Sequence, residues 1–192
     1  GVAYRDEPAI LGWELANEAR CARGVSVLTP WIAEMSEHLK RLAPNHLVGL
    51  GDEGLMNRLL ARDWLYDGSC GYDFEAFLAI PSVDFAAFHL YPETWGHGAD
   101  AGTAREFGRR WILDHAEAGS KAGKPVLLEE YGIRNKDWRE DLYGNWLDVS
   151  RGAGVAADLF WMLGAPMDNG ANYPDYDGFT LYAESLPPAI QY

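Results

Sequence analysis

The chain has 192 residues, of which 48% are hydrophobic, and a formal net charge of −13 from 16 Lys and Arg against 29 Asp and Glu. This composition predicts a folded domain with a core rather than a disordered chain. The acidic balance argues against nucleic acid as a partner, because phosphate binding needs basic patches. No run of 18 apolar residues is present, so we expect no membrane span.

Cys21 and Cys70 are the only cysteines, too few for a disulfide framework or a four-thiolate zinc site. A single bridge, formed if two loops meet, and two free thiols are both open. The chain begins with Gly1 rather than Met and shows no signal peptide, which indicates a processed or cut chain.

Strand-like and helical patterns alternate along the chain. The pattern predicts strands at 10–18, 46–51, 83–90, 125–130 and 154–163, and helices opening at Thr29–Pro30 and covering about 103–118 and 138–149. The segment 55–80 is expected to be a loop with a short helical piece, and 164–192 a long loop. This alternation is the signature of βαβ units and a parallel sheet, whose strands are buried on both faces.

Two features locate the helices more closely. Thr29 as N-cap and Pro30 at the first helical position predict where the first helix begins. The residues expected to face inward at helical spacing are Ile32, Met35, Leu39 and Leu42 in the first helix and Phe107, Trp111 and Ala118 in the next.

Two strands end in glutamate, at Glu18 and Glu130. Because α/β folds place their chemistry at the carboxyl ends of strands, these residues are candidates for one cleft. Glycoside hydrolysis requires two such carboxyl groups flanking the scissile bond. Capping of the following helix is the alternative for either one. Glu129 competes with Glu130, since successive side chains alternate faces and only one can point into the cleft.

Other polar and aromatic residues gather at the same strand ends. Asn17 could hydrogen-bond a sugar hydroxyl, His89 and Tyr91 end the strand between the two glutamates, and Trp161 could stack on a pyranose. A lone histidine or tryptophan is more often part of the core, so these candidates depend on occurring together. Glu14 and Glu53 are weaker candidates, expected to be structural or to lie at the rim. With no HExxH motif and no His/Cys cluster, neither a catalytic metal nor another cofactor is expected.

Four segments resemble the retaining β-mannanases of glycoside hydrolase family 5: Trp13–Cys21, Phe88–Pro92 with Trp95, Lys124–Gly132 and Tyr173–Phe179. The resemblance implies a (β/α)8 TIM barrel, secretion, and endo-hydrolysis of β-1,4-mannosidic linkages in mannans, galactomannans or glucomannans. The roles it implies are acid/base for Glu18, nucleophile for Glu130, contact with the sugar 2-hydroxyl for Asn17, and substrate binding for His89, Tyr91, Trp95 and Trp161. Ala19 stands where the family usually has Pro.

The first three strands of such a barrel have no counterpart in the sequence. The chain therefore resembles the C-terminal five-eighths of the enzyme: one catalytic-type domain over 1–192, α/β in class, with about five parallel strands corresponding to strands four to eight. Open sheet edges would favour self-association and weigh against hydrolysis by this chain alone.

Three alternatives follow from the same residues. A β-1,4-glucanase could use this scaffold, since mannose and glucose differ at one hydroxyl. A non-catalytic carbohydrate-binding module would keep the cleft without turnover. A structural half-barrel would self-associate to complete its sheet.

Overall fold

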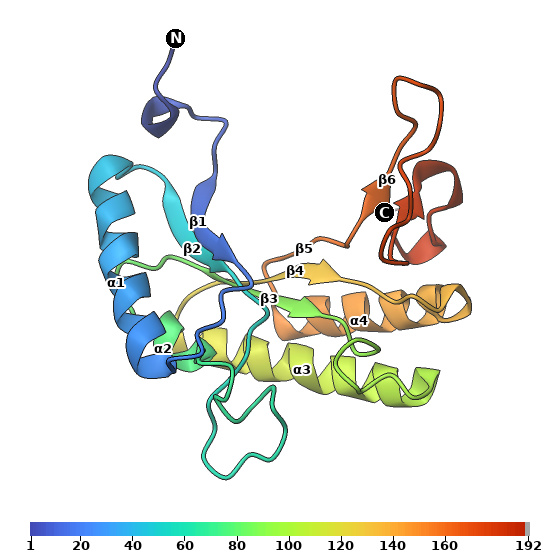
Figure 1. The fold of residues 1–192 in the computed structure, drawn as a ribbon, viewed down its shortest axis with the longest axis horizontal. Coiled ribbons are helices and arrows are strands. Elements are labelled where there is room, and N and C mark those ends of the chain that lie inside the picture. The colour runs from blue at the N-terminus through green and yellow to red at the C-terminus, as the bar shows by residue number, and fades with distance from the viewer. Residues whose placement is uncertain (191–192) are drawn as a thin grey trace. The chain divides into compact units, whose positions relative to one another are not determined.

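The computed structural model of the protein describes residues 1–190 and shows an α/β fold, as the sequence predicts (Figure 1). The strands are β1 (Gly12–Asn17), β2 (Leu47–Gly51), β3 (Ala86–Leu90), β4 (Val126–Tyr131), β5 (Ala157–Asp158), β6 (Leu163–Gly164) and β7 (Leu181–Tyr182). The α-helices are α1 (Val25–Leu42), α2 (Phe74–Leu78), α3 (Ala101–Ala122) and α4 (Arg139–Ala153), with 3-10 turns at Tyr4–Asp6, Lys136–Trp138, Ala183–Ser185 and Pro188–Ile190. No helix in the described range combines the length and apolar character needed to cross a bilayer.

Two compact units divide the chain. The first comprises Gly1–Phe88 and Glu117–Leu127, and the second comprises His89–Ala116 and the described residues from Leu128 onward. The boundaries fall within β3, α3 and β4, so each of these elements contributes residues to both units.

In the first unit, β1 and β2 pair in parallel, with Gly12 opposite Leu47 and Trp13 opposite Val48. β2 is buried as a covered strand should be, and Val48 and Leu50 are fully inaccessible. β1 is partly exposed along its length. The prediction of burial on both faces is therefore wrong for β1, in which no residue is fully buried.

α1 begins at Val25, four residues before the predicted cap at Thr29, so Pro30 lies inside the helix. The extra turn brings Leu28 into the buried face. Its packing outweighs the backbone hydrogen bond that Pro30 cannot make. At the other end Leu42 is 49% exposed, so the last member of the predicted apolar face lies outside the core.

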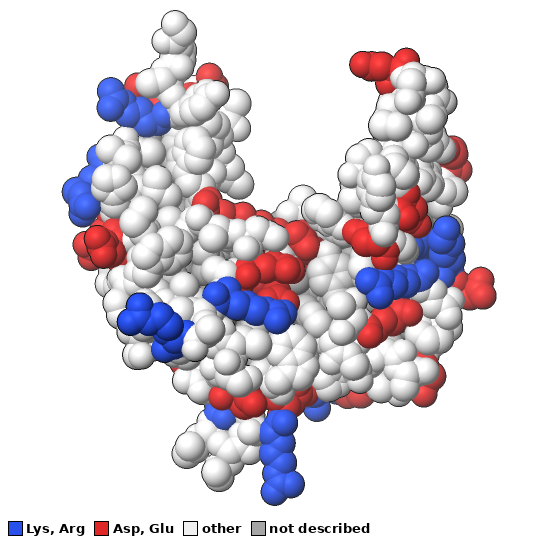
Figure 2. Space-filling model, viewed as in Figure 1, with Lys and Arg blue, Asp and Glu red and all other residues white. Residues whose placement is uncertain are grey.

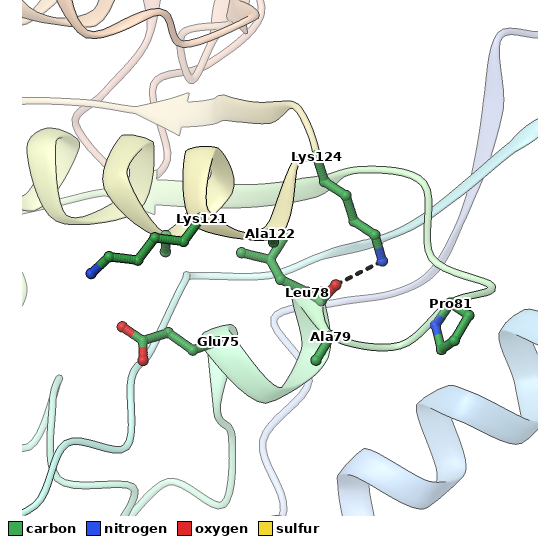
Figure 3. Close-up of a pocket in the computed structure, with 8 residues that line it drawn as sticks. Glu75, Leu78, Ala79, Pro81, Lys121, Ala122 and Lys124 are labelled. Atoms are coloured by element: carbon green, nitrogen blue, oxygen red, sulfur yellow. Dashed lines mark hydrogen bonds between the residues drawn. The ribbon is translucent and has the colours of Figure 1, made fainter.

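Lys124 joins the start of β4 to the end of α2 within the first unit (Figure 3). Its Nζ donates to the carbonyl oxygens of Leu78 and Ile80, at 2.6 Å each. Burial lowers the pKa of this ammonium group. A pocket of about 430 Å³ adjoins it, lined by Glu75, Leu78, Ala79, Pro81, Ala118, Lys121, Ala122 and Lys124.

Large aromatic side chains fill the core of the second unit. Trp111 on α3 and Tyr143 and Trp146 on α4 are fully buried. The indole of Trp111 donates to the carbonyl of His89 at 2.8 Å, which fixes α3 against the end of β3. Phe107 is 4% exposed, so the predicted inward face of this helix is confirmed. Ala118, which belongs to the first unit, is also buried.

Within the predicted fifth strand, 154–163, regular strand geometry is found at β5, which pairs with β4, and at Leu163, where β6 begins. Backbone hydrogen bonds from Leu159 to Leu128 and from Trp161 to Tyr131 continue the pairing beyond it. The two donors are two residues apart and the two acceptors three, so the ladder is irregular.

The predicted long loop after this strand is mostly irregular but contains β7 and its parallel pairing with β6. Arg139, 5% exposed, holds this segment through its guanidinium, which donates to the carbonyls of Ile133, Gly178 and Thr180. Residues 191–192 of that predicted loop lie outside the described residues.

Candidate active site

Glu18 directly follows β1 in the first unit. Its amide donates to the carbonyl of Gly51 at 2.6 Å, and its φ is +48°, in the left-handed region that non-glycine residues adopt uncommonly. Strain of this kind concentrates at functional sites, where surrounding structure enforces it. Asn17, the last residue of β1, is exposed and pairs in register with Gly51.

Arg20 and Glu53 form a bidentate ion pair next to Glu18 in sequence. Nε and Nη2 of Arg20 donate to the two carboxylate oxygens at 2.7 and 2.5 Å, and Glu53 is 2% exposed. The hydrogen bond to Glu53 raises the pKa of Arg20 further. Glu53 is thus a structural carboxylate that anchors the loop after β1, the role expected for it, and Glu14 is exposed.

Cys21 follows in the same loop. Its amide donates to the carbonyl of Cys70 at 3.0 Å, so the two cysteine-bearing loops do meet. Both thiols are free in the structure.

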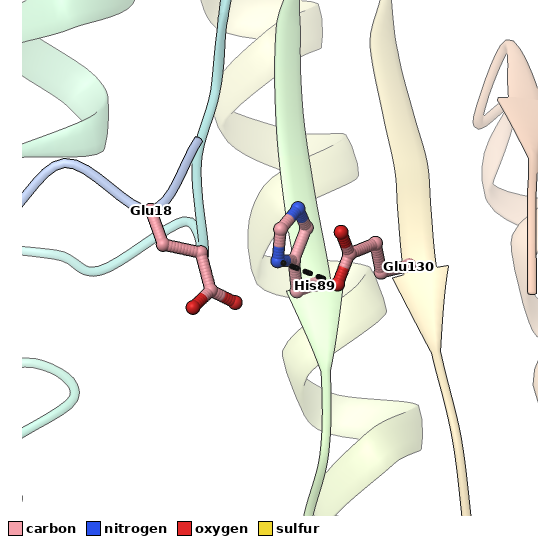
Figure 4. Close-up of side chains that lie close together, drawn as sticks. All are labelled: Glu18, His89 and Glu130. Carbon is pink, nitrogen blue, oxygen red and sulfur yellow. Dashed lines mark ion pairs between the residues drawn. The ribbon is translucent and has the colours of Figure 1, made fainter. Parts of the chain in front are cut away.

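Glu130 lies near the end of β4 in the second unit, with an 18% exposed side chain. The Tyr91 hydroxyl donates to its Oε2 at 2.7 Å. Nδ1 of His89 lies 3.4 Å from the same oxygen (Figure 4). The sequence had placed His89 and Tyr91 at one strand end. The structure brings both to the carboxylate, where they can orient it and stabilise its negative charge.

Glu129 also approaches His89, with its Oε2 3.5 Å from Nε2. Each ring nitrogen of His89 therefore faces one of the two carboxylates, and which glutamate points into the cleft stays a prediction. Only Glu130 receives the Tyr91 hydroxyl. His89 is fully buried, and each of its ring nitrogens faces a carboxylate. Its contact with substrate stays a prediction.

The ring of Trp95 packs against the ring of Tyr91. The two rings meet edge-on with centroids 6.1 Å apart, and Trp95 also packs against Trp111 at 5.6 Å. Only 7% of Trp95 is exposed. In the structure its ring makes edge contacts with Tyr91, Phe107 and Trp111. Its role in substrate binding stays a prediction.

Trp161 is 39% exposed and its backbone amide donates to Tyr131, the residue after Glu130. Its indole Nε1 donates to Oδ2 of Asp177 at 2.8 Å. Asp177 was not among the predicted site residues. The sequence could have pointed to Asp177 because it lies in the segment Tyr173–Phe179, which carries part of the family resemblance.

The second unit therefore groups His89, Tyr91, Glu130 and Trp161 around the end of β4. Asn17 and Glu18 occupy a strand end of the first unit. The group in the second unit has the parts of a nucleophile site: a carboxylate held by a hydroxyl and an imidazole, with an exposed indole in the segment between β5 and β6.

This fold and a positioned carboxylate at a strand end define a glycosidase-type α/β domain. Residues 1–161 match the family model described as GH family 5 beta-mannosidase-like, and the chain belongs to this family. It is 43% identical over 183 residues to mannan endo-1,4-beta-mannosidase F of Aspergillus fumigatus, covering 93% of this chain and 39% of that protein.

Two solved structures are similarly close. The endo-1,4-beta-mannanase of Rhizomucor miehei is 41% identical with a TM-score of 0.87, over 96% of this chain and 52% of that one. The endo-beta-1,4-mannanase of Thermotoga petrophila is 41% identical with a TM-score of 0.88, over 98% and 44%. The chain thus spans about half or less of the length of these relatives.

Proposed function

We propose that the protein is a retaining endo-β-1,4-mannan hydrolase. The observation that carries the proposal is the Tyr91 hydroxyl bonded at 2.7 Å to Glu130 beside the His89 ring, in a chain about 40% identical to named mannanases. The substrate class is a polymer of β-1,4-linked mannose, and Trp161 offers an exposed ring for stacking.

In the proposed mechanism, ionised Glu130 attacks the anomeric carbon while protonated Glu18 gives its proton to the departing glycosidic oxygen. Glu18 then takes a proton from water, which attacks the glycosyl–enzyme and releases Glu130 with retained configuration. Tyr91 and His89 keep the nucleophile oriented throughout. Asn17 is proposed to bind the 2-hydroxyl of the reacting sugar.

We further propose that β1 to β5 correspond to strands four to eight of a (β/α)8 barrel. The partial coverage of the Rhizomucor miehei mannanase, 52%, supports this correspondence. Three additional strand–helix units encoded upstream of Gly1 are the expected finding, and their absence would refute the correspondence.

Paired substitutions test the roles of the carboxylates in the full-length protein. Glu130→Gln should lower mannan hydrolysis by roughly 10³-fold or more, whereas Glu129→Gln, the same change one residue earlier, should retain most activity. Glu18→Gln should lose mannan hydrolysis yet still release dinitrophenol from an aryl β-mannoside in a burst, because that leaving group needs no proton. Wild-type rates in Glu130→Gln would remove the assignment.

Substrate choice is tested by release of reducing ends from mannan and cellulose oligomers side by side. Faster cleavage of mannan is expected. Preferential cleavage of cellulose oligomers would indicate the glucanase instead, and binding without any release would indicate a non-catalytic module.

A further inference from the structure

The ring of Trp161 is held by a single side chain. Its Nε1 donates to Oδ2 of Asp177, while its backbone amide is bound to Tyr131. These two contacts fix both ends of the residue and leave 39% of it exposed. A stacking platform benefits from such fixation, since a mobile indole would lose conformational entropy when a sugar binds.

Asp177 is itself fixed at its other polar atoms. Its Oδ1 accepts from the amide of Phe179 at 3.0 Å, and its carbonyl accepts from Nε of Arg134 at 2.9 Å. The Arg134 guanidinium lies 5.0 Å from the centroid of the Phe179 ring. The carboxylate that meets the indole therefore has a defined position.

The loop that carries Asp177 also contacts Tyr91, the residue that donates a hydrogen bond to Glu130. The Phe179 ring packs on Tyr91 with centroids 5.0 Å apart, and Tyr91 holds Glu130. Gly132 lies beneath this contact, where a Cβ would come within 2.7 Å of the Phe179 ring and 3.0 Å of the Tyr91 ring. The segment from Asp177 to Phe179 thus links the exposed indole to the carboxylate.

We propose that Asp177 is a positioning residue that fixes the plane of Trp161 for stacking against a sugar next to Glu130. The inference deepens the proposed function and rests on it, with a β-1,4-linked manno-oligosaccharide as the ligand. Asp177 acts through the indole and does not touch the sugar. The competing role is a brace for the turn to Phe179 alone.

Asp177→Asn separates these two roles. Asparagine makes the contact with the amide two residues on as readily as aspartate does, so the turn to Phe179 is kept. Its NH2 group then faces the indole N–H of Trp161, and two donors cannot bond. Asp175→Asn is the matched control: it removes the same charge from the same loop, and its Oδ1 serves Thr180 at 3.0 Å.

The first readout needs no ligand. In the full-length protein labelled with 15N-tryptophan, the indole resonance of Trp161 is assigned by its loss in Trp161→Phe. Asp177→Asn should shift this resonance and speed its hydrogen exchange several-fold, and Asp175→Asn should do neither. An unchanged resonance and exchange rate in Asp177→Asn would overturn the proposal.

The second readout is the affinity for mannohexaose, measured by calorimetry with every protein, the wild-type reference included, carrying Glu130→Gln so that the ligand is not hydrolysed. Asp177→Asn should weaken binding about 10-fold, the effect of one lost hydrogen bond. Asp175→Asn should bind like wild type, and Asp177→Asn should add nothing in a Trp161→Phe background. A shifted indole resonance with unchanged affinity would also overturn the proposal. Failure of the wild-type reference to bind mannohexaose would instead refute the proposed function.

Discussion

At the scale of single residues, the hydroxyl of Tyr91 is the contact that distinguishes Glu130 from Glu129. Tyr91→Phe removes it and leaves the ring packed against Phe179 and Trp95. Without the hydroxyl the nucleophile is no longer oriented, so kcat on mannan should fall roughly 10- to 100-fold. The lost hydrogen bond to a charged group should also cost about 1.5–3 kcal/mol of stability.

Tyr131→Phe is the control for this prediction. Tyr131 follows Glu130 directly, but its hydroxyl lies 3.3 Å from Asp158 on β5. Its loss should cost about 1 kcal/mol of stability or less and leave kcat within about twofold. Equal losses of kcat in the two variants would show that Tyr91 acts only through packing.

The sequence predicts which site residues lie close together where their positions follow from strand periodicity. His89 lies in β3 and Tyr91 directly follows it, while Glu130 lies near the end of β4, so their approach could be expected from neighbouring strands of one sheet. The burial of Trp95 could not, because it depends on rings that α3 brings from a distance. The contact of Asp177 with Trp161 lies in an irregular loop, where no period predicts which side chains meet.

At the scale of elements, α3 and α4 approach closely at Gly108. A Cβ there would lie 2.1 Å from Nε1 of the buried Trp146. Gly108→Ala should therefore destabilise the protein by about 1–2 kcal/mol, since overpacking exceeds the gain in helix propensity. Gly152→Ala in α4, where a Cβ meets nothing within 4 Å, should stabilise it by about 0.5–1 kcal/mol. Urea unfolding measures both, and a stabilised Gly108→Ala would contradict the close approach.

In the first unit, Lys124 connects the start of β4 to the end of α2 through hydrogen bonds to two backbone carbonyls. Lys124→Met removes the ammonium donor from the carbonyls of Leu78 and Ile80, of which Ile80 keeps the amide of Val83, and should cost about 1–3 kcal/mol. Lys121→Met, at the same pocket, removes an exposed side chain paired with Glu117 and should change stability far less, because an exposed ion pair is screened by solvent. Similar costs for the two variants would mean that the Lys124 hydrogen bonds add nothing.

The stability difference between wild type and Lys124→Met should also depend on pH. Burial lowers the pKa of Lys124 in the folded state below its ordinary value of 10.5, so above the folded pKa the unfolded chain binds more protons. Wild-type stability relative to the variant should therefore rise with pH through the folded pKa and level off above about 10.5. A difference that shrinks over this alkaline range would contradict the burial effect.

The sequence predicted the strands β2, β3 and β4 well because their apolar runs are bounded by Pro, Gly or charged residues. The start of α1 was predicted too late, since Pro30 suggested a first turn although Leu28 already packs in the core. β5 was predicted too long, because an apolar segment reveals little about the regularity of its hydrogen bonds.

At the scale of the whole molecule, net charge and free sheet edges have opposite effects on association between copies of the chain. The net charge is −13, and acidic and basic side chains are scattered over the face shown in Figure 2, with uncharged surface between them. Like net charge on every copy opposes association. β1, however, pairs only with β2 in the described sheet, and a free strand edge favours pairing with another chain.

Association of the 192-residue chain should therefore strengthen with salt, from about 0.02 M to about 0.5 M, as screening shortens the reach of the repulsion. It should also strengthen as the pH falls from 7 toward the isoelectric point of 4.7. Sedimentation velocity at several concentrations measures it. Ala16→Lys places a charge on β1 and should restore monomers, whereas Ser120→Lys adds the same charge on α3 and should not. Equal behaviour of the two variants would mean that net charge alone, without pairing at β1, controls association.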